Sequence, residues 1–180
     1  MRRLLDWDPQ TDWARQVRDL ALARFAGFVM RPDYFGNNAW RVVAVPGRSP
    51  DEYDQARHWA QVAARIAPED YVSLGTRGAA EYRCGDLAAA LQTLTLAQEL
   101  WLETAPTPNE SSVATWAFMA MTHAARGALA EACSELNEAW RHFDVLVSKS
   151  RREHQDYPDM VRLLEEAERQ VQDRMKRPRG

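Results

Sequence analysis

One pattern of small and apolar residues occurs three times along this sequence and constrains the fold more than any other feature. Ala56, Ala90 and Ala132 each begin the pattern. The residues four and seven positions after them are small or apolar: Ala60 and Ala63, Leu94 and Ala97, Leu136 and Ala139. The first two alanines are 34 residues apart and the third lies 42 further along. The extra residues fall in the proline-containing polar stretch 104–112, where a loop insertion costs little free energy. A fixed period of this length predicts stacked supersecondary units.

A second helix is predicted upstream of each repeated alanine, so each unit is expected to form a helical hairpin. Apolar and small residues recur every three or four positions before Gly85 and before Gly127. Both glycines stand where a left-handed residue would end the first helix, and Asp86 can cap the start of the next one. Ala128, at the equivalent position of the later unit, is a poor cap. Such a hairpin cannot bury its apolar face alone, which predicts that the units stack.

These residues resemble the tetratricopeptide repeat (TPR) family, whose pattern is W-x2-L-G-x2-Y…A-x3-F…P. The first unit matches it with Trp40, Ala56, Ala60 and Pro68. The second matches with Leu74, Gly78, Ala90 and Leu94, with Tyr82 one place beyond the tyrosine position. The third matches with Trp116, Met119, Ala120, His123, Ala132 and Leu136. The resemblance implies an all-α fold, a right-handed solenoid of about three α-hairpins over residues 37–70, 71–111 and 112–147, with capping helices at both ends.

The first unit departs from the family pattern. Its leading helix is predicted over residues 37–45 and is cut short by Pro46 and Gly47. Its second helix is predicted to begin at Ser49, with Pro50 in the first turn and Glu52 completing a capping box. The stretch 37–56 is similar to the opening of repeat arrays that follow kinase or WD-repeat domains in large bacterial signalling proteins. This similarity implies a regulatory part of such a signalling system.

The two ends are predicted to carry one helix each. Residues 1–36 are expected to hold an N-terminal helix at 11–29, broken by Pro32 and the residues after it. Residues 148–180 are expected to hold a capping helix that opens at Pro158, followed by a basic tail that is solvated.

Composition and motifs argue against several classes of function. Residues 51–147 carry six Lys or Arg against fourteen Asp or Glu, and this net charge of −8 disfavours nucleic acid. No apolar run approaches the roughly 18 residues of a membrane span. Cys84 and Cys133 have no CxxC partner, which favours a reduced, cytoplasmic setting. No phosphate-binding or metal-binding motif is present, so we expect no enzyme activity and no cofactor.

The histidines are expected to serve packing and surface roles. His123 occupies the position of a family tyrosine and is therefore predicted to pack in the core. His58 and His142 are predicted to be half-exposed. Among the seven tryptophans, Trp7 and Trp101 are the predicted candidates for exposed anchors at an interface.

The family resemblance also implies a binding site for a protein or peptide. In TPR proteins the first helix of each hairpin lines a concave groove, and the predicted contacts here are Asn38, Arg41, Tyr82, Arg83 and Met121. The other matched positions are Val72, Ala79, Ala117 and Ala124. Two alternatives stay open: a terminal helix fills the groove, or the chain is a structural domain that oligomerises end to end. A monomer or a weak homo-oligomer is expected.

Overall fold

The structure, a computed structural model, describes residues 31–104, 107–150 and 157–176. The chain divides into two compact units, Met1–Arg31 and Pro32–Gly180, and every described helix belongs to the second. These helices are α2 (Pro32–Val43), α3 (Pro50–Ile66), α4 (Tyr71–Arg83), α5 (Leu87–Thr104), α6 (Glu110–Arg126), α7 (Leu129–Ser150) and α8 (Pro158–Lys176). No strand occurs in the described ranges, which confirms the predicted all-α class for them. The helix predicted at residues 11–29 lies outside them.

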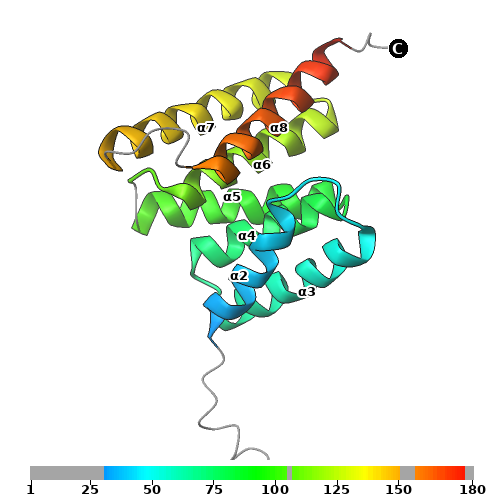
Figure 1. The fold of residues 1–180 in the computed structure, drawn as a ribbon, viewed down its shortest axis with the longest axis vertical. Helices are drawn as coiled ribbons and strands as arrows, with labels where there is room; N and C mark the ends of the chain where they lie inside the picture. The colour runs from blue at the N-terminus through cyan, green and yellow to red at the C-terminus, as the bar shows by residue number, and fades with distance from the viewer. Residues whose placement is uncertain (1–30, 105–106, 151–156, 177–180) are drawn as a thin grey trace, which may run out of the picture. The chain divides into compact units, whose positions relative to one another are not determined.

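The helices of the second unit pack as successive pairs. Helix α2 pairs with α3, α4 with α5, and α6 with α7, and the connections within these pairs are short. Short connections make paired helices antiparallel. The first helices also contact one another in order, α2 with α4 and α4 with α6, while α8 packs on α6 and α7. Figure 1 shows α4 and α5 between the α2–α3 pair and the helices that follow.

Local capping chemistry explains why the helices begin and end where they do. The Ser49 side chain accepts a hydrogen bond from the Glu52 backbone N–H, and the Glu52 carboxylate accepts one from the Ser49 N–H at 2.9 Å. This is the predicted capping box. Gly85 and Gly127 have φ of 82° and 83°, the left-handed conformation predicted for both. Asp86 accepts a hydrogen bond from the Ala89 N–H at 3.1 Å, as predicted for a cap of α5.

Two predicted boundaries are wrong. Pro32 is the first residue of α2. Proline is tolerated there, because the N–H that it lacks would have no intrahelical acceptor in the first turn. Helix α2 therefore begins five residues earlier than predicted and ends at Val43 rather than residue 45. Likewise, part of the predicted loop 104–112 is helical. Asn109 caps α6, and its side chain and Ser112 form a capping box.

Small residues allow the paired helices to approach closely, as the repeat pattern predicts. Ala56, Ala90 and Ala132 are fully buried. At Gly78 in α4 a Cβ atom would lie 2.6 Å from Cγ of Leu94 in α5, which is closer than van der Waals contact permits. Gly78 is therefore required for the observed separation of α4 and α5.

Candidate functional site

A cavity of about 360 Å³ lies between α2, α4 and α6, and we call it the α2–α4–α6 cavity. It is lined by residues from the first two to three turns of these helices and by one residue of α8: Pro32, Asp33, Gly36, Asn37, Trp40, Asp70, Val72, Ser73, Gly75, Thr76, Glu110, Ser111, Ala114, Thr115 and Met160. The N-terminal ends of the three helices therefore meet around one space. It opens to solvent, because Asp33, Val72 and Glu110 are exposed.

The shape of the cavity follows from small residues on the helices that line it. Gly36 of α2 lies beside open space, since a Cβ atom there would have no neighbour within 4 Å. Gly75 of α4 has the opposite role, because a Cβ atom there would lie 3.0 Å from Oγ1 of Thr115. Glycine at 75 thus brings α4 close to α6, while glycine at 36 keeps the α2 side open. Trp40 supplies the large aromatic group of the lining.

The charged groups of the lining are all acidic. Asp33, Asp70 and Glu110 come from three different segments, and the lining contains no lysine, arginine or histidine. Asp70 is the N-cap of α4 and accepts hydrogen bonds from the Val72 and Ser73 N–H groups at 3.3 and 3.0 Å. Its charge is partly offset by the α4 dipole. Asp33 and Glu110 stand in the first turns of α2 and α6, where a carboxylate is also favourable.

Two hydroxyls of the lining, those of Thr76 and Ser111, make no hydrogen bond within the described residues. The Ser73 hydroxyl donates to Asp70 at 2.6 Å, and the Thr115 hydroxyl donates to the Ser111 carbonyl at 2.9 Å. Neither the Thr76 oxygen nor the Ser111 oxygen is among the buried side-chain atoms that lack a hydrogen-bond partner. Both of these hydroxyls can therefore bond to solvent or to an occupant of the cavity.

The last turn of α4 is bonded to α8 through two side chains, Tyr82 and Arg83. The buried Arg83 guanidinium donates to both carboxylate oxygens of Glu166, with 2.7 Å for one of the bonds, and to the Val43 carbonyl at 2.8 Å. The Tyr82 hydroxyl donates to the Gln170 side chain. These contacts hold α8 against the end of α4, and Figure 1 shows α8 lying across α6.

The five predicted contact residues do not line the cavity. Arg83 and Tyr82 contact α8 instead, and Met121 is fully buried in α6. Tyr82 and Arg83 are thus bonded to α8 rather than facing an open groove, and Met121 has no exposed surface. Asn38 is half-buried and donates to the Tyr34 carbonyl at 2.8 Å, and Arg41 is exposed on α2. The binding role of all five stays a prediction.

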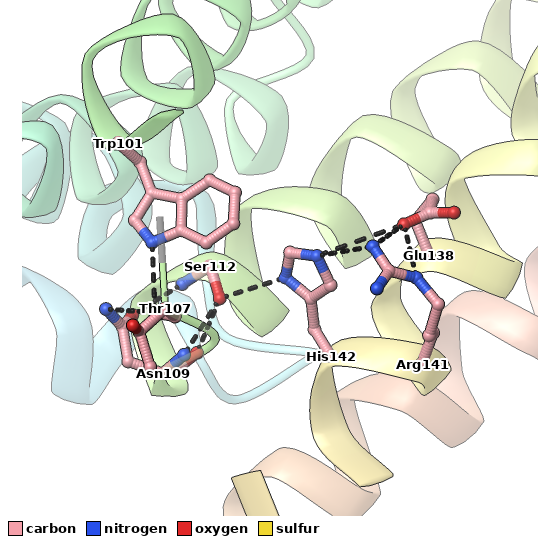
Figure 2. Close-up of polar contacts among 7 residues, drawn as sticks. All are labelled: Trp101, Thr107, Asn109, Ser112, Glu138, Arg141 and His142. Atoms are coloured by element: carbon pink, nitrogen blue, oxygen red, sulfur yellow. Dashed lines mark hydrogen bonds and ion pairs between the residues drawn. The ribbon is translucent and has the colours of Figure 1, made fainter. Parts of the chain in front are cut away.

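A polar cluster between α6 and α7 has the composition of a catalytic triad but not its chemistry. Figure 2 shows Ser112, His142 and Glu138, with Ser112 Oγ 3.1 Å from Nδ1 of His142. Arg141 can only donate, so its contact at 3.2 Å makes Nε2 of neutral His142 the acceptor. Burial, reinforced by Arg141 and opposed by Glu138, lowers the pKa of His142, which favours that neutral form. Nδ1–H therefore donates to Ser112, and His142 cannot remove the Ser112 proton.

The same cluster corrects two predicted exposures. His142 is 2% exposed rather than half-exposed, and Trp101 is buried with its ring centroid 5.0 Å from that of His142. The Trp101 indole N–H donates to the Thr107 carbonyl at 3.3 Å, which closes the loop before α6 (Figure 2). The cluster therefore joins α5, α6 and α7. Trp7, the other predicted anchor, lies outside the described residues.

A buried pair between α6 and α7 involves the histidine predicted to pack. Nε2 of His123 lies 3.3 Å from Oε1 of Glu135, and Oε2 of Glu135 has no hydrogen-bond partner. Burial, with a smaller contribution from the charge of Glu131, raises the pKa of Glu135 to about 7. Burial lowers the pKa of His123. Burial therefore favours the neutral form of both groups.

Comparisons of the chain with protein-family models, with curated proteins and with solved structures found no match. Membership of the TPR family thus stays a prediction that rests on the repeated residues. In the described ranges no three His, Cys, Asp or Glu side chains are arranged to hold a metal ion. No helix described here is both long enough and apolar enough to cross a membrane.

Proposed function

We propose that this chain is a TPR-like solenoid that binds an extended peptide segment of a partner protein in the α2–α4–α6 cavity. The observation that carries this proposal is the cavity itself, because it spans the first helices of three successive pairs. A site made from equivalent helices of a repeat array presents the same kind of surface several times in a row. An extended peptide, whose side chains also recur at a fixed spacing, suits such a surface.

The size and lining of the cavity support a peptide side chain as the occupant. Its volume, about 360 Å³, is near the lower end of the range of roughly 300–1,000 Å³ found for ligand sites. Trp40 and Val72 offer apolar contact, and Ser73, Thr76 and Ser111 offer hydroxyl groups. Aromatic groups surrounded by polar ones are typical of the centres of protein interfaces. By the resemblance noted above, the module would belong to a signalling system.

The experiment starts from the purified chain and a displayed library of randomised short peptides. Selected peptides are synthesised with both ends blocked, and their affinities are measured by fluorescence anisotropy. Gly36→Leu adds bulk to the cavity wall, starting from a Cβ atom that would have no neighbour within 4 Å. Ala130→Leu, at an exposed position of α7, makes the matched control.

We expect Gly36→Leu to weaken peptide binding by about tenfold or more, an effect of the size found for central interface contacts. Ala130→Leu is expected to leave the affinity unchanged. Circular dichroism and thermal melting establish that both variants are folded. The proposal is wrong if the library yields no binder, or if the selected peptides bind the Gly36→Leu variant as tightly as the parent chain.

A further inference from the structure

Helix α8 contributes to the α2–α4–α6 cavity although it belongs to none of the three helix pairs. Met160, in the first turn of α8, lines the cavity beside residues of α2, α4 and α6. Met160 is only 4% exposed, so it is packed against the other helices rather than loose at the rim. The position of α8 therefore determines one wall of the cavity.

One buried side chain joins α8 to the helices that form the other walls. The Arg83 guanidinium donates to Glu166 of α8 at 2.7 Å and to the carbonyl of Val43, the last residue of α2, at 2.8 Å. The Cζ atom of Arg83 also lies 5.2 Å from the centroid of the Phe118 ring in α6. A single side chain of α4 thus contacts α2, α6 and α8 at once. Detaching α8 would leave this buried cation without its carboxylate, which carries a large penalty.

A buried aromatic ring connects this ion pair to the cavity. The Phe118 ring packs edge-on against the Trp40 ring, with centroids 6.4 Å apart, and Trp40 lines the cavity. Phe118 is fully buried, so it has little room to move without its neighbours. Packed side chains therefore run from the cavity through Trp40 and Phe118 to Arg83, which is bonded to α8. Chains of packed and hydrogen-bonded side chains of this kind carry energetic coupling between two parts of a protein.

We infer that α8 is part of the peptide site: its first turn forms one wall of the cavity, and peptide binding and α8 docking stabilise each other. This inference rests on the proposed function and adds a regulating element to it. Two linked equilibria affect each other by the same factor, so a peptide that contacts docked α8 also holds α8 in place. Anything that detaches α8 then lowers the affinity of the cavity for its peptide.

The sign of this coupling follows from what α8 buries. Leu163 and Leu164 of α8 have no exposed surface, and Glu166 pairs with the buried Arg83. A peptide that displaced α8 would return these apolar groups to water and leave Arg83 unpaired. A peptide side chain confined to about 360 Å³ offers few contacts with which to offset that loss. Binding with α8 docked is therefore favoured over binding in its place.

The first measurement is amide hydrogen exchange of the full chain, with and without a selected peptide, followed by mass spectrometry. Amides of α8 that exchange faster than those of α5 in the free chain report undocking of α8 alone. With the peptide at 100 times its Kd, we expect their exchange to slow by at least about tenfold, and by about 100-fold if the peptide binds only the docked form. A scrambled peptide that does not bind should leave their exchange unchanged.

The second measurement compares two methionine variants of α8. Met160→Ala removes the side chain that lines the cavity, and Met175→Ala makes the same change at a position that is 59% exposed and outside the lining. Peptide affinity, measured by fluorescence anisotropy, should fall about fivefold or more for Met160→Ala and stay unchanged for Met175→Ala. Circular dichroism establishes whether each variant is folded. If Met160→Ala does not fold, the exchange measurement on the parent chain decides.

Several results would overturn the inference and leave the proposed function standing. One is a peptide that is blocked by Gly36→Leu but leaves α8 exchange unchanged or speeds it, because α8 is then outside the site or competes for it. Another is exchange in α8 no faster than in α5 in the free chain, because α8 then does not undock on its own. Equal affinities of folded Met160→Ala and the parent chain also overturn it. If no peptide binds at all, both the inference and the proposed function fail.

Discussion

The Glu135 carboxyl offers the sharpest test of how the core of this protein responds to pH. It is buried between α6 and α7, its Oε2 atom has no hydrogen-bond partner, and the exposed Glu131 adds a nearby negative charge. Folding therefore favours the protonated form, and the pKa of Glu135 rises from its ordinary value of 4.5 to about 7. Glu135→Gln replaces this group with a neutral one of nearly the same shape.

The magnitude follows from the two pKa values. The difference between 4.5 and about 7, at about 1.4 kcal/mol for each pH unit, gives about 3 kcal/mol. Because the folded state binds the proton more tightly, the stabilisation by that proton is complete below about pH 4.5. It is lost as the pH rises through about 7. His123 has a lowered pKa and acts in the opposite direction, but it is present in both proteins and cancels to first order.

The assay is urea unfolding of both proteins, followed by circular dichroism at several pH values between about 5 and 8. We expect the free energy of unfolding of Glu135→Gln, relative to the parent chain, to rise by about 2 to 3 kcal/mol over this range. Glu99→Gln, at an exposed position of α5, should show no such trend. A constant difference between Glu135→Gln and the parent at all pH values would refute the reasoning.

The remaining predictions concern packing, and thermal melting checks both. Gly78→Ala should lower the free energy of unfolding by about 1–3 kcal/mol, because the new Cβ atom would lie 2.6 Å from Cγ of Leu94. At Gly36 a Cβ atom would have no neighbour within 4 Å, so Gly36→Ala should stabilise α2 by up to about 1 kcal/mol. Melting temperatures that move in the same direction would contradict the packing of α4 on α5. Glu166→Ala removes the carboxylate that pairs with the buried Arg83 guanidinium and should lower the free energy of unfolding by about 3–5 kcal/mol. Glu165→Ala, at an exposed position, should lower it by less than about 0.5 kcal/mol. Equal costs would mean that α8 does not dock through this ion pair.

The features that were predicted correctly are those whose causes lie within a few residues of sequence. Gly85, Gly127 and Ser49 end or begin helices because of backbone conformation or hydrogen bonds to neighbours no more than three or four positions away. The first residue of α2 was missed because proline has two opposite local meanings. Pro32 ends a helix that approaches it and begins one that follows it, and the residues around it do not distinguish the two.

The candidate site was only partly predictable from the sequence. The α2 lining of the cavity depends on residues close together in the sequence, whereas the contacts of Tyr82 and Arg83 with α8 join residues far apart in it. Two of the α2 residues that line the cavity, Gly36 and Trp40, lie two positions before the predicted Asn38 and one position before Arg41, respectively. One position on a helix is about 100° of rotation, so a small error in register points the site at a different surface.

The part of the predicted site at the end of α4 depends on a contact between residues 83 positions apart. Arg83 is bonded to Glu166 on α8. Glu165 and Glu168 lie close to Glu166 in the sequence and carry the same charge, so the sequence does not show which of the three binds Arg83. The face of α8 that packs on α6 and α7 decides which carboxylate is buried, and that face results from the packing of whole helices. Gln170, one turn after Glu166, then receives the Tyr82 hydroxyl on the same face of α8. Tyr82 and Arg83, which the family resemblance assigns to a partner, are thus bound by α8 of the same chain, whereas the α2–α4–α6 cavity is an open part of the surface that the described first helices form.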